Sequence, residues 1–281
     1  MEIRNLKNTT IEELLSVFNR SFSDYVVPFH LSLEQLELKI EAEGIDMELS
    51  AGTFESEKLV GFILSAEKEE NGKRSIYNAG TGIIPEFRGH GLVRKMYDAM
   101  LPVFKERKAD VLILEVIVGN DPAIRAYENL GFKIMRKLLC FNGIVNVEKQ
   151  NPEVEIKDME DFQWDLFQSF WDIEPSWQSS VPVLGKIRKE CRILGAYVNG
   201  LLVGYVIYNP KARKVYQIAV DKKYRKQGVG AELFRRVGHV FEGQTVSVNN
   251  AEDTSEHTAA FLKTAAGLEN RVSQFEMEKE I

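Results

Sequence analysis

Apolar residues along the chain alternate between helical spacing and short strand-type runs. Near the start, Leu14 and Phe18 share one face of a helix, and Thr10 with Glu13 forms a capping box at its beginning. A second helix is predicted to begin after Ser32. The elements predicted next are strands near residues 49–54, 59–66 and 74–84, a helix over about 91–107, a strand at Val111–Ile117, a short helix over 121–130 and a closing strand at Phe132–Phe141.

The second half of the chain repeats this order of elements. The apolar run Leu59–Leu64 is echoed by Leu202–Ile207, and each run precedes a further strand and a glycine-containing loop. The elements predicted in this half are helical sequence near 160–172, strands near 192–198, 201–208 and 213–220, a helix near 228–241, a strand near 244–249, a helix near 255–266 and a last strand near 270–278. The chain therefore reads as one domain written twice.

The length of 281 residues agrees with two domains, since an average domain has roughly 150 residues. The polar segment Gly143–Pro152 lacks periodicity and is the natural linker, which predicts domains at residues 1–147 and 148–281. Each is expected to be an α/β (α+β) domain, a mixed and mostly antiparallel sheet flanked by helices.

Charge and hydropathy exclude several classes of partner. A formal net charge of −6 offers no broad basic surface for nucleic acid, so a small ligand is expected. No segment approaches the roughly 18 apolar residues of a membrane span, and the amino terminus has no apolar signal core. Cys140 and Cys191 match no metal-ligand spacing and are expected to be core residues. These observations predict a cytoplasmic protein without a metal, and self-association is compatible with them.

Two loops in the sequence have the chemistry of a phosphate cradle. The pattern Arg-x-x-Gly-x-Gly between a strand and a helix lets backbone N–H groups converge on an anion at the positive end of the helix. Arg225–Gly230 fits this pattern fully, and Arg88–Val93 fits it except that Val93 replaces the last glycine. A lone match of this length is often only a turn, but here the match occurs twice at equivalent places.

These residues resemble the signature of the GNAT superfamily of N-acetyltransferases. A second family signature, an aliphatic strand followed by Asn, Ala, Tyr and Gly-Phe, is matched by Leu112–Val116, Asn120, Ala123, Tyr127 and Gly131-Phe132. The resemblance implies a soluble enzyme that moves an acyl group, usually acetyl, from acyl-CoA to the amine of a small molecule or peptide. Acetyl-CoA, or another acyl-CoA, is then the co-substrate.

The resemblance also implies which residues contact CoA. The loops would hold its pyrophosphate, the strand ends just before them would pair with the pantetheine arm in a slot between splayed strands, and Asn120 would face that slot. The residues implied are Gly82, Ile83, Arg88, Gly89, His90, Gly91, Leu92, Val93 and Asn120 in the first copy, and Ala219, Val220, Arg225, Lys226, Gln227, Gly228, Val229 and Gly230 in the second.

The transfer needs a base that accepts a proton from the amine and an acid that protonates the leaving thiolate. Tyr127 stands where the family places the acid, although a helix aromatic with only a packing role is the alternative. Glu115 lies inside an aliphatic strand, where a carboxylate is costly, and is the candidate base; charge pairing within the strand is the alternative. Asp24 and Tyr25 are candidate contacts for the acceptor, and His90 is expected beside phosphate.

The second copy has the more complete loop but lacks the acid. Lys263 stands where tyrosine is expected, so this copy is predicted to hold CoA without turnover or to have a regulatory role. A non-catalytic acyl-CoA-binding protein is the alternative function for the chain. An aromatic cluster in this copy is expected to be core or interface, with an acceptor pocket as the alternative; its members are Phe162, Trp164, Phe167, Phe170, Trp171 and Trp177.

Overall fold

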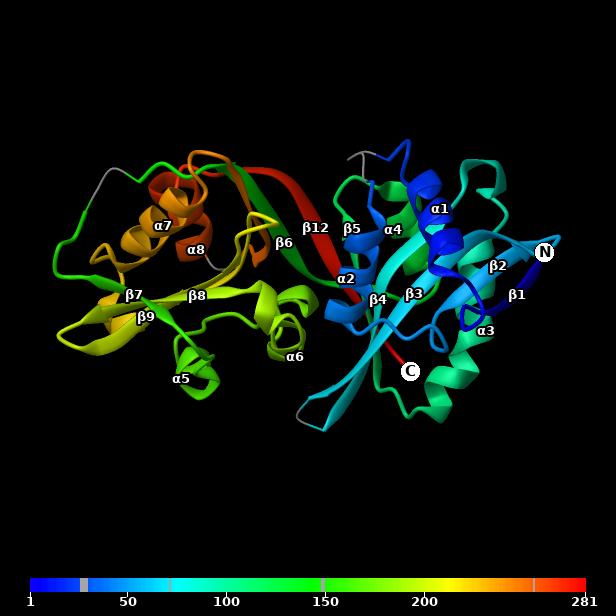
Figure 1. Cartoon of the computed structure of the whole chain (residues 1–281). Helices are drawn as coiled ribbons and strands as arrows, with labels where there is room; N and C mark the ends of the chain where they lie inside the picture. Colours follow the sequence, from blue (N-terminus) through cyan, green and yellow to red (C-terminus); the bar gives the residue numbers. More distant parts are fainter. Residues whose placement is uncertain (26–29, 71, 148–149, 255) are drawn as a thin grey trace. The chain divides into compact units, whose positions relative to one another are not determined.

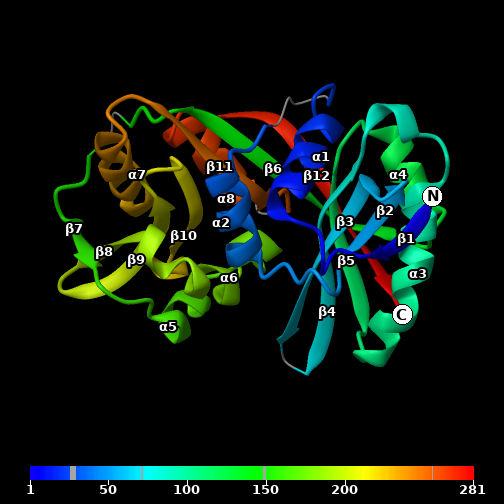
Figure 2. The same ribbon diagram turned by 45° about the vertical axis from the view of Figure 1, so that its right-hand side comes forward.

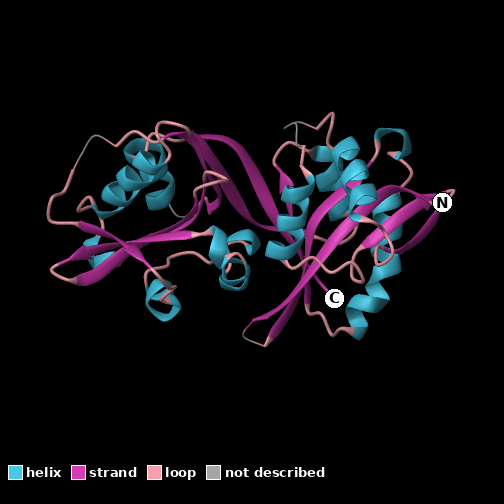
Figure 3. Cartoon of the chain, viewed as in Figure 1, coloured by secondary structure: helices cyan, strands magenta, loops and turns pink. Residues whose placement is uncertain are grey.

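The chain folds into two α/β units. The structure, a computed structural model, describes residues 1–25, 30–70, 72–147, 150–254 and 256–281. Met1–Met135 together with Glu276–Ile281 forms the first unit, and Arg136–Phe275 forms the second. Each contains a mixed sheet with helices packed on it (Figure 1 and Figure 3), so the predicted fold class is confirmed.

The sheet of the first unit combines antiparallel pairs from β1 to β4 with a parallel pair of β4 and β5. Its order is β1-β2-β3-β4-β5, followed by the end of β12. Strands β4 and β5 pair in parallel, and α3 forms the crossover between them. The strands are β1 (Glu2–Asn5), β2 (Ala51–Glu55), β3 (Lys58–Glu70), β4 (Lys73–Ile83) and β5 (Val111–Ile117). Strand β12 spans Glu269–Glu280, and its residues from Glu276 onward belong to this unit. The short β1 has no strong sequence pattern and was not predicted.

The helices of this unit are α1 (Ile11–Ser21), α2 (Leu33–Glu43), α3 (Leu92–Glu106) and α4 (Asp121–Glu128). Ser32 and Gln35 form the complete capping box expected at α2. At α1 the box is only half formed. The Thr10 hydroxyl accepts from the Glu13 N–H, but the Glu13 carboxylate accepts from the N–H of Leu59 at 3.0 Å. Glu13 therefore ties the helix to β3 instead of closing its own cap.

The packing of α1 defines one face of this sheet. The ring of Phe18 in α1 stacks on Phe62 of β3 with centroids 5.5 Å apart. Gly82 of β4 lies opposite Phe62, and its missing side chain makes room for Ser21 of α1. Alternate residues of a strand point to opposite faces, so the intervening residues of β4 point to the α3 side. We call these sides the α1 face and the α3 face.

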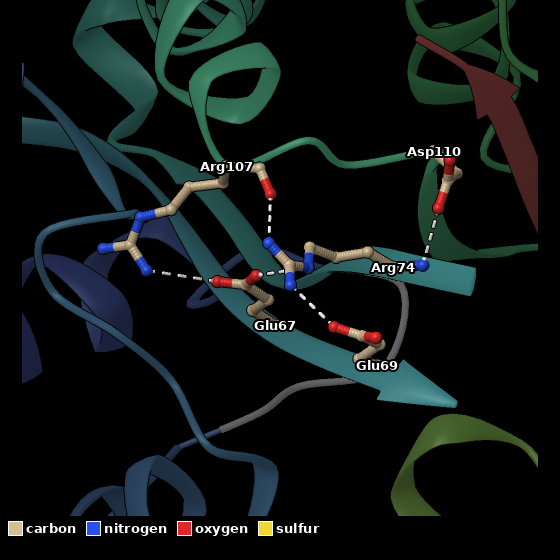
Figure 4. Close-up of polar contacts among 5 residues, drawn as sticks. All are labelled: Glu67, Glu69, Arg74, Arg107 and Asp110. Atoms are coloured by element: carbon tan, nitrogen blue, oxygen red, sulfur yellow. Dashed lines mark hydrogen bonds and ion pairs between the residues drawn. The ribbon is translucent and has the colours of Figure 1, made fainter. Parts of the chain in front are cut away.

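A charged network closes the far end of the β3–β4 hairpin (Figure 4). The Arg74 guanidinium donates to Glu69 at 2.6 Å and to the Arg107 carbonyl at 2.5 Å, and it lies 3.3 Å from Glu67. The backbone N–H of Arg74 donates to the Asp110 carboxylate at 2.7 Å. These contacts join β3, β4 and the connection from α3 to β5 at the end of the sheet away from the loop at residues 88–93.

The sheet of the second unit has the order β12-β6-β11-β10-β9-β8-β7. The strands are β6 (Lys133–Ile144), β7 (Glu155–Met159), β8 (Arg192–Val198), β9 (Leu201–Asn209), β10 (Lys214–Val220), β11 (Thr245–Glu252) and β12. The helices are α5 (Trp164–Ser169), α6 (Val181–Lys186), α7 (Val229–Val240) and α8 (Glu256–Ala260), which a π-helical turn at Phe261–Ala265 extends. The elements β7 and α6 were not predicted.

The aromatic cluster of the second copy belongs chiefly to the core of its own unit, as expected. Phe167 is fully buried and its ring stacks on Tyr205 with centroids 3.8 Å apart. Phe170 and Trp177 are also buried, and Trp171 donates through its indole N–H to the Tyr205 hydroxyl at 2.6 Å. Cys191 is buried too, and burial raises the pKa of its thiol to about 11, which fits a core residue.

Two strands, β6 and β12, lie partly in the unit formed by the other half of the sequence. Most of β6 belongs to the second unit, where its residues pair antiparallel with β11 from Leu138 to Ile144. The carboxyl end of β12 belongs to the first unit, where the Ile281 N–H donates to the carbonyl of Asp110 at 3.1 Å. Figure 2 shows the green β6 and the red β12 as long ribbons. The boundary between residues 147 and 148 therefore stays a prediction about sequence copies, since the compact units divide the chain differently.

Candidate functional site

The loop between β4 and α3 is open above its glycines. Gly89 and Gly91 have φ values of 79° and 68°, in the left-handed region, and Gly91 is the N-cap of α3. A Cβ added at either glycine would meet no heavy atom within 4 Å. The first N–H groups of a helix have no partner inside the helix, so α3 presents donors beneath this opening. His90 is exposed, and one ring nitrogen lies 3.1 Å from the Phe87 carbonyl.

The first residue of the motif, Arg88, holds the loop in place through hydrogen bonds to the ends of α1 and β4. Arg88 donates to both carboxylate oxygens of Asp24, at 2.7 and 2.8 Å, and to the carbonyls of Ser21 and Ile83. Hydrogen bonding from Arg88 lowers the pKa of Asp24. Arg88 therefore joins the end of α1 to the end of β4, and the Asp24 carboxylate, a candidate acceptor contact, is engaged with this arginine.

The pairing of strands β4 and β5 ends about halfway along β4. Their parallel pairing runs from Ser75–Val111 to Asn78–Leu114, but β4 continues to Ile83 and β5 to Ile117. Past Asn78, the edge of β4 that faces β5 has no ladder to β5. The two strands therefore separate on the side of the loop at residues 88–93, and we call this gap in their pairing the slot.

A β-bulge places polar side chains together at the slot. Leu64 pairs with Gly80 and Ser65 pairs with Asn78, so Ala79 is an extra residue in β4. Residues three apart in a regular strand point to opposite faces, but this bulge puts Asn78 and Thr81 on the same face. The Asn78 amide donates to the Thr81 hydroxyl at 2.7 Å and to the Tyr97 hydroxyl of α3 at 2.8 Å. Sequence reasoning missed this cluster because strand alternation alone places Asn78 and Thr81 apart.

Tyr127 of α4 completes the cluster on the α3 face. Its side chain is 7% exposed, and its ring makes edge contacts with Tyr97 and Phe132. Burial raises the pKa of its phenol, and hydrogen bonding with Thr81 opposes that shift. The phenol therefore remains protonated at neutral pH.

Asn120 and Tyr25 lie beside this tyrosine cluster. Asn120 caps α4, accepting from the Ala123 N–H, and its amide donates to the Tyr25 hydroxyl at 3.0 Å. The charge of a Tyr25 phenolate would raise the pKa of Tyr127 further. Asn120 thus lies between the carboxyl end of β5 and α4, and Tyr25 joins it from the segment after α1. The contact of Asn120 with the pantetheine arm stays a prediction.

Glu115 points to the other side of the sheet. Leu114 pairs with Asn78 and shares its face, so Glu115, the next residue of β5, points to the α1 face. Gly80 and Gly82 of β4 also lie on that face and carry no side chain. The candidate base and the candidate acid therefore lie on opposite faces of the slot.

The second unit repeats the arginine anchor and the bulge. Arg225 donates to Asp172 and to the carbonyls of Phe170 and Val220, as Arg88 does in the first unit. Hydrogen bonds from Arg225 and Lys222 outweigh the effect of burial and lower the pKa of Asp172. The bulge of β10 falls between Val215 and Gln217, the counterpart of the one at Ala79.

The loop of the second unit is covered by its own chain. The Asn151 amide donates to the Gln227 carbonyl at 2.7 Å, and a Cβ on Gly228 would lie 3.2 Å from the Asn151 Cβ. The Asn151 N–H donates to the buried carboxylate of Glu232, in the first turns of α7, at 2.6 Å. At the same place relative to the N-cap glycine, α3 has Lys95.

The slot of the second unit is apolar where that of the first is polar. By position relative to the loop, Val215, Ile218 and Phe234 replace Asn78, Thr81 and Tyr97. Lys263 replaces Tyr127, and the pairing of β10 with β11 places Asn249 at the position of Glu115. The ring of Phe261 packs against Gly230, so that a Cβ there would lie 3.3 Å from it.

Among the described residues, no helix combines the length and the hydrophobicity that a membrane span requires. The same residues contain no group of three or more metal-ligating side chains in position to hold an ion. The cytoplasmic location and the compatibility with self-association stay predictions.

The sequence matches a family twice. Residues 11–132 and 156–263 each match the family described as Acetyltransferase (GNAT) family, and together they cover most of the chain. N-alpha-acetyltransferase 30 of Schizosaccharomyces pombe is 32% identical over 92 residues, which are 32% of this chain and 61% of that protein. Mycothiol acetyltransferase of Thermobispora bispora is 33% identical over 129 residues, 43% of this chain and 42% of that protein. The chain thus spans less than two thirds of either relative.

Solved structures show the same fold over nearly the whole chain. A GCN5-related N-acetyltransferase from Sphaerobacter thermophilus superimposes with a TM-score of 0.77 at 15% identity, covering 99% of this chain and 95% of that one. A tandem GNAT protein from the clavulanic acid biosynthesis pathway gives a TM-score of 0.69 at 13% identity, covering 99% and 98%. The predicted tandem arrangement is confirmed.

Proposed function

Because the chain belongs to the acetyltransferase (GNAT) family, we propose that its first unit transfers an acyl group from acyl-CoA, acetyl in the first instance, to an amine. The observation that carries this proposal is the cluster of Tyr127, Tyr97, Thr81 and Asn78 at a splayed slot beside an open phosphate loop. The second unit has the same fold without this cluster.

The first unit fits acyl-CoA as its co-substrate. The N–H groups of residues 89–93 would hold the pyrophosphate at the start of α3, where the helix dipole favours negative charge. The unpaired edge of β4 at Gly82 and Ile83 would pair with the amides of the pantetheine arm, as an added strand does. Asn120 would face the arm from the other side of the slot. The thioester would then lie between the two faces of the sheet.

The proton transfers are assigned to opposite faces of the slot. Glu115 would accept the proton that the amine loses, on the α1 face, where a Cβ on Gly80 of β4 would meet nothing closer than 3.9 Å. Attack on the thioester carbonyl forms the new C–N bond and breaks the C–S bond, and Tyr127 would protonate the departing sulfur from the α3 face. This separation keeps the donor and the acceptor of protons from neutralising one another.

Substitution of Tyr127 tests the acid. The change Tyr127→Phe keeps the ring and its packing but removes the transferable proton, so kcat should fall by about 100-fold, the usual contribution of acid catalysis. The matched control is Tyr208→Phe, which removes a buried phenol from the second unit and should leave kcat unchanged. Full turnover by the Tyr127 variant would remove the acid assignment.

The second candidate function concerns the second unit, which we propose holds no CoA and supports the first. Asn151 lies on its loop, Glu232 places a carboxylate near the start of α7, and Phe261 packs on Gly230. The binding residues predicted at Arg225–Gly230, Ala219 and Val220 remain predictions from the resemblance, and these contacts count against their use.

Paired charge reversals at the two loops test this assignment. Isothermal titration should find a single CoA per chain. Lys95→Glu in the first unit should raise the Kd by about fivefold, because it opposes the anion at the helix start. Lys226→Glu, an exposed position of the other loop, should leave the Kd unchanged. Two sites, or the reverse pattern of effects, would contradict the proposal.

The acceptor is proposed only as an amine. One relative is named an N-alpha-acetyltransferase and another a mycothiol acetyltransferase. A screen should therefore compare peptide α-amines with small-molecule amines, following thiol release from acetyl-CoA. Failure of every amine would leave the alternative of a non-catalytic acyl-CoA-binding protein.

A further inference from the structure

The amide of Asn78 is held in one orientation. Its Oδ1 accepts from the N–H of Gly80 at 3.0 Å, so its Nδ2 must face the hydroxyls of Thr81 and Tyr97. An amide nitrogen only donates, and both of its hydrogens are directed at these two oxygens. Thr81 and Tyr97 therefore each accept one hydrogen bond from Asn78 and keep their own hydrogens to donate elsewhere.

We propose that Asn78 and Thr81 are positioning residues that stabilise Tyr127 in the form it takes after giving up its proton. Asn78 occupies one acceptor site of the Thr81 hydroxyl, which leaves the Thr81 hydrogen to be donated to the Tyr127 oxygen. This inference rests on the proposed transferase function, since it assigns a task to residues around the proposed acid. Neither residue needs to touch acyl-CoA for this role.

The need for such support follows from burial. A phenolate in a buried site is costly unless it receives hydrogen bonds, and burial raises the pKa of both Tyr127 and Tyr97. Hydrogen bonding with Thr81 acts against that shift at Tyr127. A hydroxyl that donates to the phenolate makes Tyr127 a stronger acid without exposing it to water.

The second unit supplies an internal comparison. It keeps the bulge in β10, but Val215 and Ile218 stand in place of Asn78 and Thr81, and Lys263 stands in place of the tyrosine. The polar pair is therefore absent from the unit that lacks the acid. This is expected if the pair serves the acid, since the fold itself forms without it.

We call the hydrogen bonds that run from Asn78 through Thr81 to Tyr127 the relay. The variant Thr81→Val tests it and has a matched control. Thr53 in β2 is fully buried, whereas Thr81 is half-buried, and the Thr53 hydroxyl has no hydrogen-bond partner among the described residues. Thr53→Val therefore makes the same chemical change away from the slot. Thr81→Val should lower kcat by about tenfold, the value of one hydrogen bond to a charged group. It should leave the KM for acetyl-CoA nearly unchanged. Thr81→Ser should restore kcat.

The pH profile separates this role from a structural one. Loss of the Thr81 donor raises the pKa of Tyr127, so the basic limb of the kcat profile should move to higher pH in Thr81→Val and in Asn78→Asp. A profile of Thr81→Val that superimposes on that of Thr53→Val would overturn the relay, and so would an equal loss of kcat in both variants.

A second measurement does not depend on activity. Ultraviolet difference titration of the phenols, with Tyr127→Phe as the reference, should show Tyr127 ionising at higher pH in Thr81→Val than in the unchanged protein. If no acyl-CoA is turned over at all, the transferase proposal fails, but this titration still decides the relay. An unchanged Tyr127 titration would count against the relay even in an active enzyme.

Discussion

Arg88 and Arg225 make the same set of contacts in the two copies of the fold. Each pairs with an aspartate just after the preceding helical segment and donates to two backbone carbonyls. The sequence motif placed both arginines in phosphate loops, but their charge is neutralised by Asp24 and Asp172. Anion binding at such a loop is therefore left to its backbone donors, as the glycines had suggested.

The Asp24–Arg88 pair leads to a prediction about acid stability. The pKa of Asp24 is lowered by Arg88, so the pair stabilises the fold fully above the ordinary aspartate value of about 3.9 and loses that effect as the pH falls through the lowered value. Asp24→Asn should therefore lower stability at neutral pH and flatten its decline below about pH 4.

Acid unfolding followed by circular dichroism measures this effect. Asp98→Asn is the control, because Asp98 is exposed on α3 and no ion pair is recorded for it among the described residues. An Asp24→Asn curve parallel to that of the unchanged protein would contradict the assignment.

At the scale of elements, β4 carries most of the site through features that differ from a regular strand. It parts from β5 after Asn78, it bulges at Ala79, and it has glycines at positions 80 and 82 on the α1 face. Periodicity located the strand well, since the prediction of residues 74–84 compares with Lys73–Ile83. It did not locate the bulge, because an extra residue is defined only by the partner strand.

The two glycines of β4 should respond differently to a methyl group. A Cβ on Gly82 would lie 2.6 Å from the Phe62 ring and 2.8 Å from the Ser21 Cβ, whereas a Cβ on Gly80 would meet nothing closer than 3.9 Å. Gly82→Ala should destabilise the protein by about 1–3 kcal/mol through overpacking. Urea unfolding measures this change.

Gly80→Ala is the matched control and should keep stability within about 0.5 kcal/mol. Equal stability of both variants would show that α1 can shift away from β4 at no cost. In that case the close packing of Ser21 on Gly82 would not fix the position of α1.

At the scale of the whole molecule, the two copies exchange the ends of two strands. The residues after Phe275 belong to the first unit, and Met277 among them is fully buried. Neither copy therefore contains, in continuous sequence, all the strands of its unit.

Removal of residues 276–281 should damage the first unit although it cuts the end of the second copy. The end of β12 neighbours β5, so its loss exposes the edge of β5, and the N–H groups of residues 111–117 should exchange with deuterium faster. Hydrogen exchange with mass spectrometry measures this, and activity should fall with the loss of order in β5.

A chain with six polar residues added after Ile281 is the control for disturbing the terminus without removing the strand. Unchanged protection of β5 in the shortened chain would show that the first unit closes its sheet without β12. Faster exchange confined to the second unit would contradict the observed division in the same way.

The sequence by itself determined the duplication, the order of elements, the two glycine loops and the tyrosine at position 127. These features depend on local spacing or on motifs within a few turns of chain, so they can be read before any contact is known. The structure decided what depends on contacts between distant residues. Asn78 and Thr81 meet through a bulge, Asn151 covers a loop far along the chain, and β6 and β12 join sheets that chain order does not indicate, because strand pairing fixes them and sequence spacing does not.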